Sequence, residues 1–353
     1  MTDIKSMFCT EIEKEMAAMN QPRFRAQQIF RWLQKEGAGF DEMSNLPKSL
    51  REALKKKYIV PSAEIETKQV SAIDGTVKYL FRLYDGEYIE SVFMRYEYGN
   101  TLCISTQAGC RMGCRFCAST LKGLKRSLYA SEMISQIQTA EKDMGEKVSG
   151  VVLMGMGEPL DNYDNVLRFL RLVNDENGLN IGHRHISLST CGLVENIRRL
   201  ADEKLQITLS VSLHAPNDAL RRNIMPVARR YSIDSLLSAC RYYEETTGRR
   251  VSFEYALISG VTDKTELADE LGQRLKGTLC HVNLIPVNEI KEREYKRASR
   301  ASADAFVRRL GEYGITATVR RRMGADISAA CGQLRDEHES CAHSAGGGAA
   351  ENG

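Results

Sequence analysis

From residue 101 onward, the sequence repeats one pattern six times: a short run of β-branched and apolar residues, a turn, and a longer helical segment. Strands that alternate with helices form parallel sheets or barrels, because each helix returns the chain to the same end of the sheet. The expected fold is an α/β partial (β/α)6 barrel, whose chemistry gathers at the carboxyl ends of the strands. The pattern predicts strands over 101–106, 149–154, 184–190, 206–213, 251–258, 280–286 and 315–320, and helices over 130–144, 163–174, 193–203, 232–246, 264–276 and 299–313.

The chain before residue 101 follows two other patterns. Its first part carries apolar side chains at helical spacing, and the part after residue 60 alternates between apolar and polar side chains, with a hairpin signal at Asp85-Gly86. We therefore expect four regions along the chain. They are an N-terminal helical accessory domain over 1–60, a short β-hairpin extension packed on the barrel over 61–100, the barrel over 101–335 and a flexible tail over 336–353.

The composition is that of a globular protein, with 42% hydrophobic and 27% charged residues among 353. No run approaches the ~18 consecutive apolar residues that a membrane-spanning helix needs. Acidic residues interrupt the N-terminal segment where a signal peptide would have its apolar core, so we expect a cytoplasmic protein without a membrane partner. The net charge of +3 decides nothing about nucleic acid, since a basic face can lie on a nearly neutral protein.

Ten cysteines in a chain expected in the cytoplasm favour metal or thiol chemistry over a disulfide framework. Three of them, Cys110, Cys114 and Cys117, lie at Cys-x3-Cys-x2-Cys spacing on a glycine-containing loop directly after the first strand of the repeat. Three thiolates on such a loop suit an iron–sulfur cluster with one iron left open. Zinc is an alternative, although structural zinc usually has four protein ligands. Three incidental core cysteines are another alternative.

Small or polar residues follow several of the other predicted strands at their carboxyl ends, which share one edge of the predicted barrel. Glycine lets a ligand approach the main chain closely, and a carboxylate accepts hydrogen bonds from an ammonium group. Ordinary explanations remain open, because Glu158 can be an acid at a helix start and His214 a packed histidine. Their shared position nevertheless favours a ligand site. The residues are Gly157, Glu158, Ser189, Ser212, Leu213, His214 and Asn288.

The cysteine loop resembles that of the radical S-adenosylmethionine (SAM) superfamily, in which the open iron of a 4Fe–4S cluster binds SAM. Longer motifs along nearly the whole chain resemble the dual-specificity RNA methyltransferases that methylate C2 of adenine. The resemblance implies that the predicted barrel is a radical SAM barrel. The motifs are QAGCRMGCRFCAST, VVLMGMGEPLDN, LSTCG, VSLHAPND, HVNLIPVN and GADISAACGQL, with FRAQQIFRWL and FDEMSNLPKSLRE nearer the N-terminus.

The resemblance also implies functional roles. Cys331 matches the cysteine that carries the methyl group, Cys103 the cysteine that resolves a protein–RNA adduct, and Glu90 the proton acceptor. From the residues alone, Cys103 would be a buried strand cysteine, since free cysteine packs as a small hydrophobe. The implied SAM contacts are Gly157, Glu158, Ser189, Ser212, Leu213, His214 and Asn288, and the implied cluster ligands are Cys110, Cys114 and Cys117.

The chemistry explains why such a family needs two cysteines. Adenine C2 lies between two ring nitrogens and is too electron-poor to attack a sulfonium methyl group, whereas the thiolate of Cys331 is a good nucleophile. In the implied mechanism a radical from a second SAM activates the methyl group for addition to C2, and Cys103 or Glu90 removes the C2 proton. Cys103 then attacks Cys331 to free the RNA, so two SAM are consumed and a transient Cys103–Cys331 disulfide must be reduced.

The implied substrates are 23S rRNA, at an adenosine of the peptidyl-transferase centre, and tRNA, at the adenosine 3′ of the anticodon. A target adenine must leave its stack to reach such a site, and a basic accessory domain could hold the RNA beyond it. An electron donor such as flavodoxin is plausible, and nothing demands more than a monomer. The candidates for a phosphate-binding rim, or for ordinary solvated charges, are Arg111, Arg115, Lys122, Lys125, Arg126, Arg320, Arg321 and Arg322.

Three alternatives stay open at this point. The first is a related enzyme that methylates the same rRNA adenosine at C8, with the same cluster and the same two cysteines. The residues of the motifs SLHAPND, GMGEPL and FCAST resemble those of the C2 group. The second is a non-catalytic RNA-binding protein whose cysteines hold zinc. The third is a radical SAM enzyme with another substrate, which would have no use for Cys331.

Overall fold

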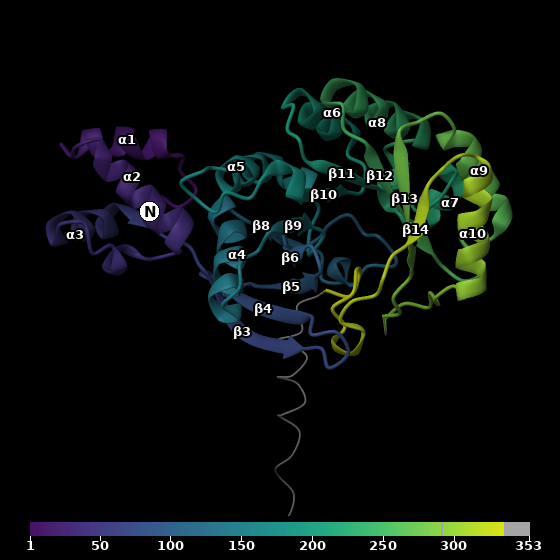
Figure 1. The fold of residues 1–353 in the computed structure, drawn as a ribbon, viewed down its shortest axis with the longest axis horizontal. Helices are drawn as coiled ribbons and strands as arrows, with labels where there is room; N and C mark the ends of the chain where they lie inside the picture. Colours follow the sequence, from purple (N-terminus) through teal and green to yellow (C-terminus); the bar gives the residue numbers. More distant parts are fainter. Residues whose placement is uncertain (291, 335–353) are drawn as a thin grey trace, which may run out of the picture.

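The computed structural model describes residues 1–290 and 292–334, so the tail predicted over 336–353 lies outside the described residues. One ten-stranded sheet forms the centre of the fold, in the order β14-β13-β12-β11-β10-β9-β6-β5-β4-β3. Helices cover its outer face, and the N-terminal helices lie at one end of the molecule, beside α4 and α5 (Figure 1).

The seven strands from β6 to β14 pair in parallel, which confirms the predicted α/β class. Each predicted strand and helix is present within a few residues of its expected bounds. The strands are β6 (Gly99–Cys103), β9 (Gly150–Leu153), β10 (Ile186–Thr190), β11 (Thr208–Ser212), β12 (Val251–Leu257), β13 (Cys280–Pro286) and β14 (Ala317–Val319). The helices are α4 (Ala130–Met144), α5 (Tyr163–Val173), α6 (Val194–Asp202), α8 (Ile233–Thr247), α9 (Thr265–Leu275) and α10 (Arg300–Glu312). The pattern missed the short helix α7 (Asp218–Ile224).

Three antiparallel strands extend the parallel sheet beyond β6. They are β3 (Ala63–Val70), β4 (Val77–Leu83) and β5 (Tyr88–Tyr96), and the Asp85-Gly86 turn joins the last two. β5 pairs with β6 so that Val92 lies opposite Cys103. The extension is thus hydrogen-bonded into the barrel sheet, and one face of β5 continues the inner wall on which Cys103 lies.

The N-terminal region contains α1 (Cys9–Ala18), α2 (Phe24–Arg31), a π-helical turn (Trp32–Glu36) and α3 (Lys48–Lys57). The short strands β1 (Thr2–Asp3) and β2 (Tyr58–Ile59) pair and bring its two ends together. Polar contacts join the region to α4: the Lys5 ammonium donates to the Ser135 hydroxyl at 2.6 Å, and the Gln138 amide donates to the Leu33 carbonyl at 2.9 Å. Apolar side chains of both parts belong to one buried cluster, so the helical region packs directly on the barrel.

The cysteine loop begins where β7 (Gln107–Gly109) ends, and β8 (Leu124–Ser127) follows it. Gly109 has a φ of +75°, and a Cβ atom there would lie 1.9 Å from the Gly123 carbonyl oxygen. Only glycine fits this position, because both the backbone conformation and the close approach exclude a side chain. The two short strands therefore close the loop at its base and present residues 110–123 above the carboxyl end of the barrel.

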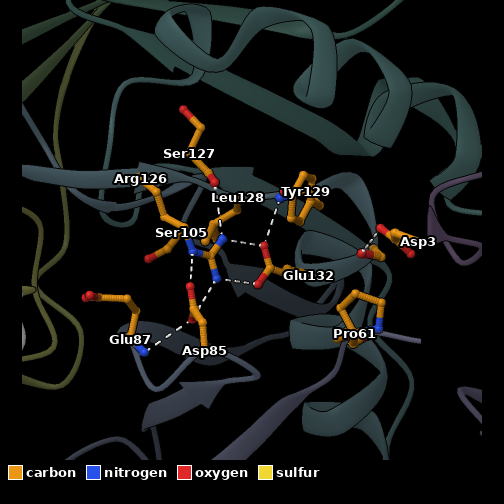
Figure 2. A network of polar contacts seen from close by, with 12 residues as sticks. Asp3, Pro61, Asp85, Glu87, Ser105, Arg126, Ser127, Leu128, Tyr129 and Glu132 are labelled. Carbon is orange, nitrogen blue, oxygen red and sulfur yellow. Dashed lines mark hydrogen bonds and ion pairs between the residues drawn. The ribbon is translucent and has the colours of Figure 1, made fainter. Parts of the chain in front are cut away.

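A buried polar network ties β8 to the sheet extension and to α4 (Figure 2). The Arg126 guanidinium donates to Asp85 at 2.9 Å and to both Glu132 oxygens at 2.7 and 2.8 Å. Glu132 also accepts from the Tyr129 main-chain N–H at 2.8 Å, which caps the start of α4. The Glu132 side chain is fully buried and Arg126 is largely buried, so this ion pair anchors the end of the cysteine loop to the rigid part of the fold.

We expect Glu132→Gln to lower the free energy of unfolding by about 2–3 kcal/mol, because it leaves the Arg126 guanidinium largely buried without its main carboxylate. Urea denaturation followed by circular dichroism measures the loss. Glu146→Gln is the matched control, since it breaks an Arg95–Glu146 pair whose two side chains are more than a third exposed. Equal losses in the two variants would contradict an anchoring role for Glu132.

Candidate active site

One cavity at the carboxyl end of the parallel strands brings together ten of the thirteen predicted site residues. Its volume is about 160 Å³, and we refer to it as the cofactor cavity. Predicted site residues from four different strand ends, from the cysteine loop and from the C-terminal segment meet there. They are Cys110, Cys114, Cys117, Gly157, Glu158, Ser189, Ser212, His214, Asn288 and Cys331. Among the predicted residues, Leu213, Cys103 and Glu90 are not in this lining.

The three cysteines of the loop face the cofactor cavity and are shielded from water. Burial raises the pKa of the Cys110 thiol to about 12 and that of Cys114 well above its usual value. These thiols are therefore neutral in the absence of a metal. Binding to iron would remove their protons, because a thiol that coordinates a metal is deprotonated. Among residues 1–290 and 292–334, no three His, Cys, Asp or Glu side chains converge on a point that would hold a single metal ion. Structural zinc usually has four protein ligands, whereas the cysteine ligands of a cluster bind separate irons, so three loop cysteines fit a cluster.

Glu158 is fixed at the rim by hydrogen bonds that its carboxylate accepts from the main chain. Its side chain is buried and accepts from the main-chain N–H groups of Cys191 at 2.7 Å and Leu160 at 3.0 Å. Burial raises the pKa of Glu158, and these N–H groups act in the opposite direction. The bond to Leu160 also caps a 3-10 turn, so the ordinary explanation of Glu158 as a helix-start acid applies as well. The residue before it, Gly157, has a φ of +104° and packs so closely on Gln107 that a side chain would not fit.

His214 is a neutral histidine in a left-handed backbone conformation, with a φ of +58°. Its Nδ1 accepts from the Ala256 N–H at 2.9 Å, so the proton lies on Nε2. Burial lowers the pKa of His214 to about 3, and the Arg221 charge acts in the same direction. The adjacent Leu213 is buried and contributes only main chain to this region: its carbonyl accepts from Arg221 at 3.0 Å.

Arg221 is a structural feature of the site that sequence reasoning missed. It is completely buried, and it donates to the main-chain carbonyls of Cys191 at 2.7 Å, Ser212 at 3.1 Å and Leu213 at 3.0 Å. One guanidinium thus joins the chain segments that follow β10 and β11. Its position on the seven-residue α7 explains why the pattern missed it, since so short a helix has little periodicity.

Two buried acceptors in the cofactor cavity lack a hydrogen-bond partner within the described part of the chain: Asn288 Oδ1 and Glu254 Oε2. The other side-chain polar atom of each is engaged, because Asn288 donates to the Cys331 carbonyl at 3.0 Å and Glu254 accepts from Asn283 at 2.9 Å. Buried acceptors of this kind require a donor from a ligand or water. The ammonium, hydroxyl and amino groups of SAM are such donors, so the residues present fit this cofactor.

A second, smaller cavity adjoins the cofactor cavity, and we refer to it as the thiol cavity. It contains Cys103 and shares Cys331 and Arg320 with the cofactor cavity. Burial raises the pKa of the Cys103 thiol to about 12, Cys331 raises it further, and Arg320 lowers it. The two predicted catalytic cysteines therefore border one space. All nine cysteines of the described residues are free, so the predicted disulfide is not formed in this structure.

Glu90 lies outside both cavities. Its buried carboxylate is 3.2 Å from the buried ammonium of Lys78, on the neighbouring strand β4. Its main-chain carbonyl accepts from the Ser105 hydroxyl at 2.6 Å. The structure thus places Glu90 two residues from Val92, the residue that faces Cys103, and engages its charge with a lysine.

Comparisons with known proteins identify the class. Residues 104–271 match the radical SAM superfamily, and residues 2–60 match the ribosomal RNA large subunit methyltransferase N-terminal domain. A crystal structure of a radical SAM methyltransferase from Sphaerobacter thermophilus superimposes with a TM-score of 0.90 at 45% identity, covering 95% of this chain and 99% of that one. The fold and the cysteine loop therefore define a radical SAM enzyme, a class that uses SAM and a 4Fe–4S cluster.

Curated relatives narrow the class further. A protein of Alkaliphilus oremlandii named probable dual-specificity RNA methyltransferase RlmN is 57% identical over 336 residues, or 95% of this chain and 98% of the relative. A protein of Clostridium novyi with the same name is 53% identical with the same coverage. The chain belongs to this RlmN family of RNA methyltransferases. Within the described residues, no helix combines the length and apolar character needed to cross a membrane.

We expect Cys114→Ala to abolish cluster binding, because the remaining two cysteines of the loop cannot hold three irons. Iron and sulfide analysis of anaerobically reconstituted protein, together with its visible absorption, measures this. Cys191→Ala is the matched control: Cys191 is buried in the same cavity but lies outside the motif, so this variant should retain the iron of the wild type. Bound zinc in place of iron would contradict the assignment.

His214 gives the fold a specific dependence on pH. Its folded pKa of about 3 lies below the ordinary 6.5, so the unfolded chain binds one more proton between these values. Stability from this group is therefore complete above pH 6.5 and falls as the pH decreases, by about 1.4 kcal/mol per pH unit. Between pH 6.5 and 4.5, we expect the free energy of unfolding of the wild type to fall more steeply than that of His214→Asn, by about 1.4 kcal/mol for each pH unit. Parallel curves for the two proteins would show that His214 is not held neutral.

Proposed function

We propose that this enzyme methylates C2 of an adenosine in 23S rRNA, at the peptidyl-transferase centre, and of the adenosine 3′ of the anticodon in tRNA. The names of its relatives, with dual specificity for RNA, support the substrate class. The observation that carries the proposal is the meeting of the two cavities at Cys331, with Cys103 also in the lining of the thiol cavity. A methyl-carrying thiol has to face both a methyl donor and a substrate, and Cys331 borders both spaces.

In this proposal Cys110, Cys114 and Cys117 hold the cluster, and the rim residues hold SAM. When bound, these groups supply a methyl group and a carbon-centred radical, with two SAM consumed per turnover. The Glu158 carboxylate and Asn288 Oδ1 would accept hydrogen bonds from the SAM ammonium, and Glu254 Oε2 from a hydroxyl or amino group. Gly157 lets the ligand approach the main chain closely, and Ser189, Ser212 and His214 add hydrogen-bonding groups. Leu213 remains a predicted contact outside the cavity lining, with its carbonyl engaged by Arg221.

Cys331 acts first as the nucleophile that accepts the methyl group. After this group has been joined to C2, the Cys103 thiolate attacks the Cys331 sulfur. The bond between that sulfur and the methylene carbon breaks, its electron pair stays on the carbon, and the carbon takes a proton to become the methyl group of the product. The resulting Cys103–Cys331 disulfide needs two electrons and two protons from a thiol reductant before the next turnover.

Cys103 is better placed than Glu90 to remove the proton from C2. Cys103 borders the thiol cavity, whereas the Glu90 carboxylate is engaged with Lys78 outside both cavities. Glu90 remains a predicted proton acceptor that would require Lys78 to release it.

The proposed RNA contacts divide into exposed groups that line the thiol cavity and groups engaged in ion pairs. Arg321 and Arg322 are exposed and line the thiol cavity, which suits phosphates beside a base that has entered it. Arg111 and Arg126 are engaged in ion pairs, with Asp161 and with the network around Glu132. We further propose that the N-terminal helices hold the RNA beyond the target base. We also propose that the enzyme is a cytoplasmic monomer and that a flavodoxin-type protein supplies its electrons.

The decisive experiment incubates the anaerobically reconstituted enzyme with SAM, a reductant and protein-free 23S rRNA or tRNA, and digests the RNA to nucleosides. Mass spectrometry against 2-methyl- and 8-methyladenosine standards identifies the product. We expect 2-methyladenosine from the wild type, and at least a 100-fold loss in Cys331→Ala, because no other described thiol lines both cavities.

The same experiment separates the alternatives. Formation of 8-methyladenosine would retain the two-cysteine mechanism and move the enzyme to the C8-methylating relatives. Release of 5′-deoxyadenosine without a methylated product would indicate another substrate, and full activity of Cys331→Ala would exclude the S-methylcysteine route. Absence of all SAM chemistry in protein that holds its iron would favour a binding protein.

A further inference from the structure

Arg320 lies at the boundary between the two cavities and lines both. Its main-chain N–H donates to the Leu284 carbonyl at 2.8 Å, which fixes the residue beside β13. Both terminal nitrogens of its guanidinium lie 3.4 Å from the Met154 sulfur, and one lies 3.6 Å from Glu254 Oε2. The cation is thus directed into the site by the Glu254 carboxylate, in the middle of β12, and by the Met154 thioether, directly after β9.

The two arginines that follow in sequence are arranged differently. Arg321 and Arg322 are exposed, whereas the Arg320 side chain is 29% exposed and its partner Glu254 only 3%. A run of three arginines suggests a uniform phosphate-binding rim. The structure instead separates one partly buried cation, which lines both cavities, from two exposed cations, which line the thiol cavity alone. A role in contacting the RNA backbone therefore does not account for the position of Arg320.

The neighbours of Arg320 supply that explanation. The Cys331 thiolate, more than any other group, raises the pKa of Arg320, and Glu254, Cys103 and Tyr96 act in the same direction. In return, Arg320 is the one charged group that lowers the pKa of the buried Cys103 thiol. The charged and titratable groups near Cys103 come from several packed elements. They are Cys331, Arg320, Arg321 and Arg322 on the C-terminal segment, Arg297 before α10, Tyr96 and Glu90 on β5, Lys78 on β4 and Glu254 on β12.

We propose that Arg320 is a positioning residue for the Cys103–Cys331 pair: its guanidinium, held in place by Glu254, stabilises the thiolate that each cysteine must form to react. The proposal rests on the proposed function, because it assumes that both sulfurs act as nucleophiles. A thiolate in a site shielded from water is costly unless a cation faces it. Glu254 prevents the guanidinium from turning outward, and its second oxygen is fixed by Asn283.

The test measures thiol reactivity in the full-length, cluster-loaded enzyme, without RNA or SAM. Iodoacetamide is attacked by a thiolate sulfur at its methylene carbon and loses iodide, so its rate of reaction reports the thiolate fraction. Quantitative peptide mass spectrometry follows each cysteine separately under anaerobic conditions. We expect Arg320→Gln to slow the alkylation of Cys103 about tenfold at pH 8, equivalent to one pKa unit, and to move its pH profile toward higher pH. Arg320→Lys should recover part of the rate because it keeps the charge.

Arg321→Gln is the matched control. It removes a neighbouring arginine from the thiol cavity, so it should weaken binding of 23S rRNA fragments while the Cys103 rate stays that of the wild type. Cys9, on α1, serves as an internal standard in every variant, because it lies far along the chain from both cavities and an unchanged rate there shows an intact fold.

Two results would overturn the proposal. One is a Cys103 rate in Arg320→Gln equal to that of the wild type, above all with RNA binding weakened as in Arg321→Gln, because Arg320 would then be an RNA contact. The other is a wild-type Cys103 that reacts no faster than Cys240, a buried cysteine outside both cavities whose pKa burial also raises to about 12. Failure of the methylation assay with the Arg320 effect intact would reject the proposed function alone.

Discussion

The site depends on the parallel register of the strands from β6 to β14. Hydrogen bonding places Ser212 beside Glu254, Glu254 beside Asn283 and Asn283 beside Thr318, so one row of side chains crosses four neighbouring strands near their carboxyl ends. Parallel pairing of this kind requires a helix to return the chain after each strand. The side chains that follow the strands consequently share one rim, although they are widely spaced in the sequence. A shift of one strand by one residue would turn its rim side chain toward the covering helices.

This dependence explains why the sequence predicts so much of the fold. Each strand–helix unit has a local pattern, and α10, expected over 299–313, is found at Arg300–Glu312. The rim residues follow from the same pattern, because strand ends are visible in the sequence. The helix α7 was missed for a physical reason: it has seven residues, and one of its two buried side chains is Arg221, which any apolar pattern counts as exposed.

Contacts between side chains on different strands of the barrel could not be predicted from the sequence. Arg320 meets Met154 and Glu254 only because the barrel curves β14 toward β9 and β12 over long sequence separations. The sequence presents Arg320 as one of three equivalent arginines, and nothing local separates it from the other two. Likewise, the buried pairing of Glu90 with Lys78 comes from the alignment of β5 with β4. Residue type and spacing predict a location, whereas a buried charge takes its role from a partner that the fold supplies.

The fully buried Arg221 and the partly buried Arg320 differ in the groups that face their charges. Arg320 has a carboxylate beside it, so its charge is largely balanced before any thiolate forms. Arg221 donates to main-chain carbonyls, which carry no net charge, and one of its terminal nitrogens has no hydrogen-bond partner among the residues described. Burial lowers the pKa of Arg221, although the Asp218 carboxylate raises it. The Arg221 charge lies close enough to Cys114 to lower the pKa of this thiol. An anionic cluster bound by three thiolates is the kind of group that balances such a cation, because attraction between unlike charges is strong where water is excluded. The guanidinium that joins the segments after β10 and β11 therefore lies beside Cys114, one of the predicted cluster ligands.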